Sequence, residues 1–267
     1  MFVAGGEGMR LEASVAAVRI CGVLDGPWEL ALALFAAFCV GVSKAGFSGT
    51  SLLGVAIFTH LYGAKAQAGM ALPLLILADI IVYPAFRKHG SWNDVWRLLP
   101  AALVGLAVGW WLLGNVSELT ARRTIGVAIL LMLALQGLRA LKPGVLEKMA
   151  DHQAFGTGAG VAGGVTTMLA NAAGPVIQLY LLSRRLPKME MIGIGARFFL
   201  LINLIKVPIN GQLNLINTET LLENLKLGPG IVAGIFIGKW LLLKVPQRAF
   251  EWMILFFAAF AAVRMLS

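Results

Sequence analysis

Charged side chains are scarce in this sequence. Only 13% of the 267 residues are Asp, Glu, Lys or Arg, whereas 59% are hydrophobic, and the mean hydropathy is +0.83. A typical soluble domain is about a quarter charged and about half apolar. The shortage of charge therefore excludes an ordinary soluble protein and predicts an all-α polytopic membrane protein.

Residues that build metal, disulfide and nucleotide sites are also few. The two cysteines, Cys21 and Cys39, have no motif spacing, and the histidines His60, His89 and His152 lie far apart in the sequence. No GxxxxGK[ST] loop, HExxH motif or paired carboxylates occur. We therefore predict neither a metal nor another cofactor, and we expect an H⁺ or Na⁺ gradient to supply any coupling energy.

The formal net charge of +9 does not indicate a nucleic-acid partner. The basic residues gather in short loops between apolar blocks, as they do in the cytoplasmic loops of membrane proteins. The predicted surroundings are a lipid bilayer.

The apolar residues form eight blocks, and most are long enough to cross a bilayer core of about 30 Å. We place them at 28–62, 66–86, 98–115, 122–140, 155–182, 190–208, 222–243 and 248–266. Residues 1–27 are interrupted by charges, lack an evident cleavable signal peptide, and are interpreted as a tail with room for an interfacial helix. The predicted organisation is a first membrane repeat over 28–140, a cytoplasmic linker over 141–154 and a second membrane repeat over 155–267.

The two repeats are homologous halves, because matching residues recur in the same order. At an offset of 129, Pro100, Gly105, Gly109 and Trp111 match Pro229, Gly234, Gly238 and Trp240. At an offset of 124, Gly69, Asp79 and Pro84 match Gly193, Asn203 and Pro208. The repeated GxxxG pairs predict tight helix packing.

The first block of each half is interrupted near its middle by glycine-rich polar sequence. Block 28–62 would be about 50 Å long as a single helix, which exceeds the bilayer core. Each such block is either a kinked spanning helix or a re-entrant hairpin. Eighteen lysines and arginines lie in the loops. If both first blocks are hairpins, twelve of these residues lie on one side of the membrane and six on the other, whereas nine lie on each side if both blocks span it. The positive-inside rule favours hairpins, and three crossings in each half then predict an inverted repeat.

Lys44 lies at the first interruption, where a charge costs roughly 2.5–3.5 kcal/mol on insertion scales. It is either a structural lysine bonded to open backbone carbonyls or an anchor for an anion. Unpaired N–H groups at half-helix ends favour an anion. Ser43 and Ser48 add hydroxyl donors, and Gly46 and Gly49 let the backbone come close to a ligand.

The second interruption carries Thr166, Thr167, Asn171 and Gly174. These residues either complete a substrate-binding site opposite Lys44 or serve close helix packing.

Three more charges lie inside apolar blocks. Asp79 is predicted to be a counter-charge for Lys44 or a proton-relay carboxylate, and the alternative is a fixed structural ion pair. Arg197 and Lys206 are expected to snorkel toward opposite ends of their block. Either could line an anion path.

The stretches "GVSKAGFSG" (41–49), "TTMLANAAGPVIQLYLLSRRLPKMEMIG" (166–193) and "RFFLLINLIKVPIN" (197–210) resemble the sulfite exporter TauE/SafE family, also called the toluene sulfonate uptake permease family. The resemblance extends from about residue 28 to the C-terminus. It implies a multi-pass transporter of two duplicated halves in the bacterial inner membrane, acting on sulfite, sulfonates, sulfoacetate and similar small anions. Lys44, Gly46, Gly49, Asn171, Gly174 and Pro175 are the positions that carry over. Family members often have a denser second glycine cluster and a small polar residue where Arg197 stands.

The predicted function is secondary transport of a small anion, most simply sulfite or an organosulfonate such as sulfoacetate. It would proceed by alternating access around a midplane site built from two broken helices. The protein is predicted not to be an enzyme. An anion channel and, more remotely, an intramembrane enzyme are the alternatives. The sequence leaves open which anion is carried, the direction, the coupling ion and whether a homodimer forms.

Overall fold

The computed structural model describes residues 24, 26–47, 50–62, 64–115, 152–212 and 215–266, together with single positions between 119 and 134. Within those residues the chain forms nine helices and no strand, which confirms the predicted all-helical class. Most of the predicted N-terminal tail and of the linker 141–154 lies outside the described residues.

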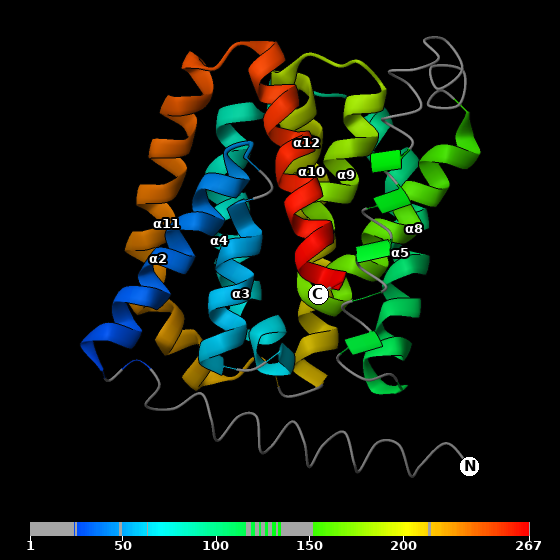
Figure 1. Cartoon of the computed structure of the whole chain (residues 1–267). Coiled ribbons are helices and arrows are strands. Elements are labelled where there is room, and N and C mark those ends of the chain that lie inside the picture. The colour runs from blue at the N-terminus through cyan, green and yellow to red at the C-terminus, as the bar shows by residue number, and fades with distance from the viewer. Residues whose placement is uncertain are drawn as a thin grey trace.

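Within each half, consecutive described helices are joined by short connections (Figure 1), whereas α5 and α8 are separated by residues 116–152, most of which lie outside the described residues. In the first half they are α2 (Pro27–Lys44), α3 (Ser51–Tyr62), α4 (Ala64–Phe86) and α5 (Trp92–Asn115). In the second half they are α8 (Gln153–Ala170), α9 (Ala173–Ser183), α10 (Lys188–Gln212), α11 (Thr218–Lys244) and α12 (Gln247–Leu266).

Five segments are long and apolar enough to cross a membrane, namely Pro27–Lys44, Gln67–Phe86, Trp92–Leu112, Lys188–Gln212 and Thr218–Lys244. By contrast, α3 has 12 residues and α9 has 11. A helix of that size is roughly 17 Å long and is too short for the bilayer core. Each short helix directly follows an interruption in the chain.

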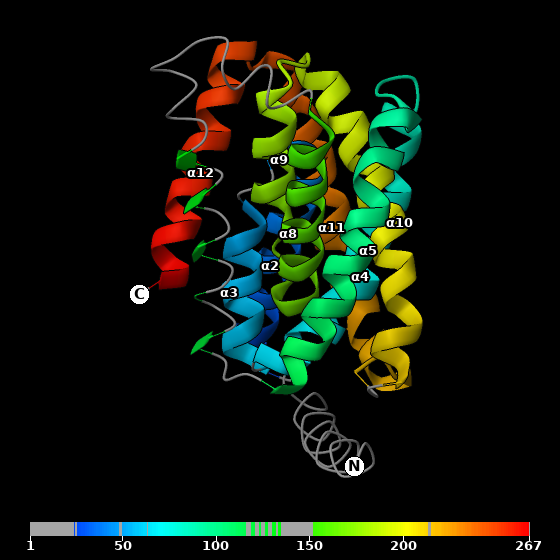
Figure 2. The same ribbon diagram turned by 90° about the vertical axis from the view of Figure 1, so that its right-hand side faces the viewer.

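Both interruptions reverse the direction of the chain. Helix α2 ends at Lys44, and Gly46 then takes a φ of +130°, which suits glycine because a side chain would be strained there. Helix α8 ends at Ala170, and the Asn171 that follows and caps it has a left-handed φ of 54°. In Figures 1 and 2, α3 runs back beside α2 and α9 runs back beside α8. The α2–α3 pair opens toward the lower end of Figure 1 and the α8–α9 pair toward the upper end.

The two halves are joined by close helix crossings. Helix α2 packs on α11, and α5 packs on α8. A Cβ on Gly234 would lie 2.2 Å from the Phe38 carbonyl oxygen, and a Cβ on Gly105 would lie 2.0 Å from that of Val161. Such separations are impossible for a side chain, so the predicted packing role of the GxxxG pairs is confirmed at these positions.

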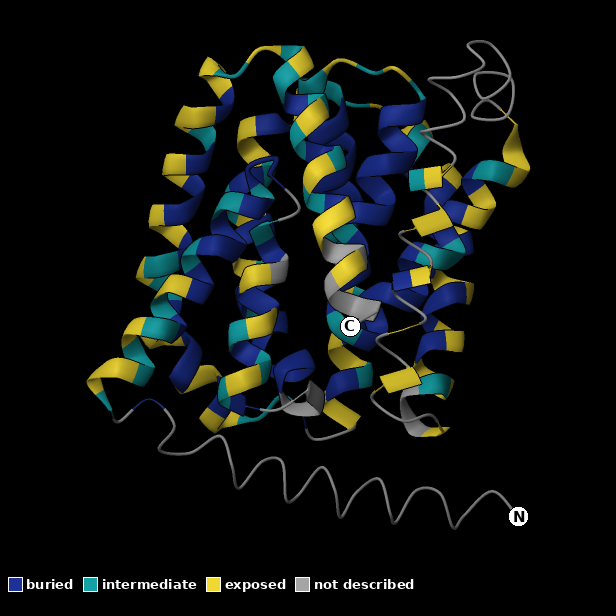
Figure 3. Cartoon of the chain, in the orientation of Figure 1, coloured by how far each residue is buried: buried dark blue, intermediate teal, exposed yellow. Residues whose placement is uncertain are grey.

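The outer surface is apolar, and polar side chains are gathered inside. Trp28, Leu225 and Trp252 are each about 70% exposed, at 69%, 73% and 71%, and Figure 3 shows such exposed positions along the outward faces of the helices. Asp79, Lys206 and other polar residues are buried. This distribution suits a helix bundle surrounded by lipid, where charges face the interior.

Candidate functional site

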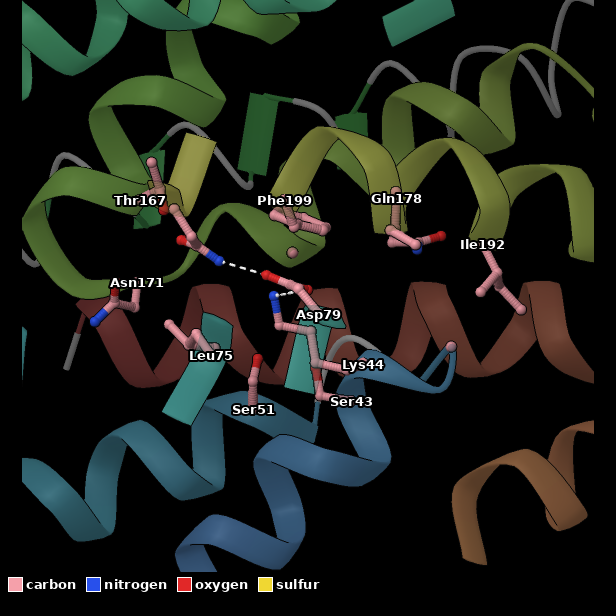
Figure 4. Close-up of a pocket in the computed structure, with 15 residues that line it drawn as sticks. Ser43, Lys44, Ser51, Leu75, Asp79, Thr167, Asn171, Gln178, Ile192 and Phe199 are labelled. Atoms are coloured by element: carbon pink, nitrogen blue, oxygen red, sulfur yellow. Dashed lines mark hydrogen bonds and ion pairs between the residues drawn. The ribbon is translucent and has the colours of Figure 1, made fainter. Parts of the chain in front are cut away.

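A cavity of about 40 Å³ lies in the interior, between the two interruptions (Figure 4). A cavity must offer at least about 10–15 Å³ to hold a water, so this one has room for water or a small ligand. Its walls come from α2, α3, α4, α9, α10 and the α8–α9 junction. The lining residues are Ser43, Lys44, Gly46, Ser51, Leu75, Asp79, Thr167, Asn171, Gly174, Gln178, Ile192, Gly195, Ala196, Phe199 and Asn203.

Lys44 and Asp79 form an ion pair on one wall of the cavity. The Lys44 Nζ lies 2.7 Å from the Asp79 Oδ1, and the two side chains are 10% and 1% exposed. The same ammonium lies 4.7 Å from the centroid of the Phe199 ring, which adds a cation–π contact. Lys44 therefore binds the Asp79 carboxylate and not backbone carbonyls, an arrangement that fits both the counter-charge and the fixed ion pair predicted for Asp79.

Asp79 also joins the two halves. Its Oδ2 accepts a hydrogen bond of 2.8 Å from the amide nitrogen of Asn203. These two residues are equivalent in the sequence repeat, at an offset of 124. Helices α4 and α10 thus face each other at the centre of the bundle, and equivalent positions meet there.

The second interruption holds a different arrangement of polar groups. Thr167 and Asn171 line the cavity, and the Asn171 amide nitrogen donates to the carbonyl oxygen of Ala68 at 3.3 Å. The Thr166 hydroxyl donates to carbonyl oxygens of its own helix, those of Ala162 at 2.9 Å and Gly163 at 3.1 Å. Thr166 is therefore not among the lining residues, although it was grouped with them from the sequence.

Lys206 does not snorkel toward the membrane surface, so that expectation is wrong. Its side chain is 1% exposed. The Nζ donates to the Thr167 carbonyl oxygen at 2.9 Å and to the Asn171 Oδ1, and it lies 3.4 Å from the Thr167 Oγ1. Oxygens at the end of α8 hold the ammonium inside the bundle, behind the residues that line the cavity.

Arg197 does not snorkel either. It is 4% exposed, and its guanidinium donates to the carbonyl oxygens of Arg87 at 2.6 Å, Gly193 at 3.0 Å and His89. Its Cζ also lies 5.4 Å from the Trp92 ring centroid. Through these bonds Arg197 holds the α4–α5 loop against α10, although its buried Nε has no partner among the described residues, and Arg197 does not line the cavity.

Gln178 lines the cavity but was not predicted as a binding residue from the sequence. Gly174 and Gln178 are one turn apart on α9, and both line the cavity. Gln178 is 4% exposed, and its Oε1 has no hydrogen-bond partner among the described residues. In Figure 4 its amide lies across the cavity from the Lys44–Asp79 pair. The available signal was the spacing of four residues from Gly174, which places both positions on one face of a helix.

The predicted binding residues therefore separate into three groups. Those that line the cavity are Ser43, Lys44, Gly46, Asp79, Thr167, Asn171 and Gly174. Those that lie elsewhere in the bundle are Thr166, Arg197 and Lys206. Ser48 and Gly49 lie outside the described residues. Within the part of the chain that is described, no cluster of three His, Cys, Asp or Glu side chains is available for a metal ion.

A helical bundle with an apolar exterior, several crossing helices and an internal polar cavity defines a multi-pass integral membrane protein. A family model described as "Sulfite exporter TauE/SafE" matches residues 33–265. The chain belongs to this family of membrane transporters. No curated protein and no solved structure matches it.

Proposed function

We propose that this protein is a secondary transporter of a small sulfur oxyanion in the bacterial inner membrane. The observation that carries the proposal is the cavity between the two interruptions, which contains Lys44 and Asp79. Two basic side chains, Lys44 and Lys206, and one acidic side chain, Asp79, lie in and directly behind this cavity. A basic group in excess over the acid favours a single anionic ligand.

The size of the cavity favours sulfite over the larger organosulfonates. A cavity of about 40 Å³ is small, and sulfite has four heavy atoms whereas sulfoacetate has twice as many. Sulfoacetate therefore requires the helices to separate further. We rank sulfite first and sulfoacetate second on this ground.

The two halves suit an inverted repeat that opens toward alternate sides. A Cβ on Gly193 would lie 2.1 Å from the His89 carbonyl oxygen, and a Cβ on the equivalent Gly69 would lie 2.2 Å from that of Leu215. The loop after α4 thus closes onto α10, and the loop after α10 closes onto α4. These loops lie at opposite ends of the bundle (Figures 1 and 2). If these two loop contacts separated one at a time, the cavity would open first to one side of the membrane and then to the other, which is alternating access.

The ion pair suggests how transport is coupled. An anion that binds Lys44 competes with Asp79 for the same ammonium. A buried carboxylate without its partner is costly, and protonation relieves that cost. Binding of the anion would therefore favour uptake of a proton by Asp79, and proton movement would accompany anion movement.

Counterflow in proteoliposomes tests the proposal. Liposomes that contain the purified protein and unlabelled sulfite should accumulate radiolabelled sulfite with saturable kinetics, and sulfoacetate should compete more weakly. Asp79→Asn should retain this exchange but lose accumulation driven by a pH gradient. The absence of exchange with sulfite, sulfoacetate and thiosulfate would overturn the proposal. Unitary currents in planar bilayers would show that the protein is a channel and not a carrier.

A further inference from the structure

Lys206 is a fully buried cation that contacts no carboxylate within the described part of the chain. Its Nζ is surrounded by three oxygens, namely the Thr167 carbonyl, the Thr167 hydroxyl and the Asn171 Oδ1. An ammonium group has three N–H donors and no acceptor, so this set of oxygens suits the charged form. The nearby Asp79 is already bonded to Lys44 and Asn203.

The oxygens around Lys206 belong to the end of a broken helix. Thr167 lies in the last turn of α8, and Asn171 is the residue that caps this helix. The Thr167 carbonyl also accepts from the Asn171 N–H at 3.0 Å, so Lys206 uses its second lone pair. As a carbonyl of the last turn it lies at the negative end of the helix dipole. In transporters with broken helices, such C-terminal ends and unwound carbonyls coordinate the coupling Na⁺ or H⁺.

We infer that the Lys206 ammonium acts as a resident monovalent cation. It occupies the position at the second interruption that a free Na⁺ ion would otherwise take. In this respect the two halves differ. The first interruption carries the cation Lys44, and its acceptor Asp79 lies on α4. The second interruption carries the acceptors, and the cation lies on α10.

The resident cation also positions the cavity wall. The Asn171 amide donates to the Ala68 carbonyl and accepts from Lys206, so both ends of the amide are held. Lys206 is thus a positioning residue, since it does not itself line the cavity. Its role in transport rests on the proposed function, whereas its role as a cation site does not.

The test is to remove the tethered cation and supply a free one. Purified Lys206→Ala is compared with wild type in N-methylglucamine, sodium, ammonium and methylammonium salts of one anion, with no oxyanion substrate present. We expect a saturable rise of several °C in the Tm of Lys206→Ala with a small cation, because a ligand that binds only the folded state stabilises it. The wild-type Tm should not depend on the cation.

Lys188→Ala is the matched control. Lys188 also donates to carbonyl oxygens at a helix end, those of Leu242 and Val245, but it is only partly buried and lies outside the cavity. An equal response of Lys188→Ala, or no response of Lys206→Ala to any of the small cations, would overturn the inference.

Transport provides a second readout that is separate from the first. Sulfite counterflow by Lys206→Ala should fall at least tenfold and should recover in part with methylammonium. If Lys206→Ala does not fold, Lys206→Met keeps most of the side-chain volume, and wild-type flux by that variant would overturn the inference. If wild type carries no sulfite, the Tm series still decides on the cation site.

Discussion

Lys44 and Asp79 contribute to stability chiefly through the cost of separating them. A buried charge whose partner is removed destabilises a protein by about 3–5 kcal/mol, whereas replacing both partners is often nearly neutral. Asn203 would remain as a neutral hydrogen-bond partner for Asp79. Stability and transport should therefore respond differently to single and double substitutions.

We predict that Lys44→Met lowers the free energy of unfolding by about 3–5 kcal/mol, because it leaves the Asp79 carboxylate buried with an amide alone. The double variant Lys44→Met/Asp79→Asn should recover most of that stability but should not transport. Thermal unfolding in detergent and sulfite counterflow measure the two effects. Undiminished transport by Lys44→Met would show that Lys44 does not anchor the anion.

We predict that Gln178→Leu weakens anion binding about 10- to 100-fold without lowering stability. The Gln178 Oε1 has no partner among the described residues, so an apolar replacement removes an unsatisfied group. A hydrogen bond that the Gln178 amide N–H donates to an anionic ligand contributes about 1.5–3 kcal/mol, which sets the expected loss of affinity.

The control for this variant is Gln67→Leu. Gln67 is 1% exposed and also has an unpaired amide atom in the described part of the chain, but it does not line the cavity. Affinity for sulfite follows from thermal-shift titration. Equal affinities for Gln178→Leu and Gln67→Leu would remove Gln178 from the binding site.

Among the helices, glycine sets how closely the two halves approach. On α11, Gly230, Gly234 and Gly238 face α2, and the atoms nearest to their ideal Cβ positions lie 2.2–2.8 Å away. Gly228, on the same helix, has nothing within 4 Å. Two glycines in one helix therefore have opposite structural roles, and a single substitution at each can separate them.

We predict that Gly234→Ala destabilises the protein by more than about 2 kcal/mol, because the added methyl would meet the Phe38 carbonyl and α2 would have to move. Gly228→Ala should be neutral or stabilise by up to about 1 kcal/mol, because it adds helix propensity in open space. Tm and the yield of monodisperse protein report both effects. Similar losses for the two variants would contradict the crossing shown by the structure.

For the whole molecule, the direction of each hairpin determines the topology. The α2–α3 and α8–α9 pairs open toward opposite ends of the bundle (Figure 1). Two basic pairs lie at the side toward which the α8–α9 pair opens. Arg87 and Lys88 follow α4, and Arg184 and Arg185 follow α9, and both helices end at that side. The positive-inside rule assigns that side to the cytoplasm.

We predict that single cysteines at Trp28 and His60, in a cysteine-free background, react with an impermeant maleimide from outside intact cells. Cysteines at His152 and Pro187 should react only after the membrane is opened. All four positions are exposed. Labelling of positions 28 and 60 from different sides would mean that residues 28–62 cross the membrane, and the inverted repeat would then fail.

Composition was sufficient to predict an all-helical membrane bundle, because hydropathy acts locally along the chain. The division into two homologous halves stays a prediction from the sequence repeat. The pairing of Lys44 with Asp79 was among the sequence predictions, because few charges lie deep in the apolar blocks. Only the tertiary structure decided the other buried contacts. Lys206 with Asn171 and Arg197 with the α4–α5 loop join separate elements, so no local pattern specifies them. The two lysines that look alike in the sequence therefore have different surroundings, one on the wall of the cavity and one behind it.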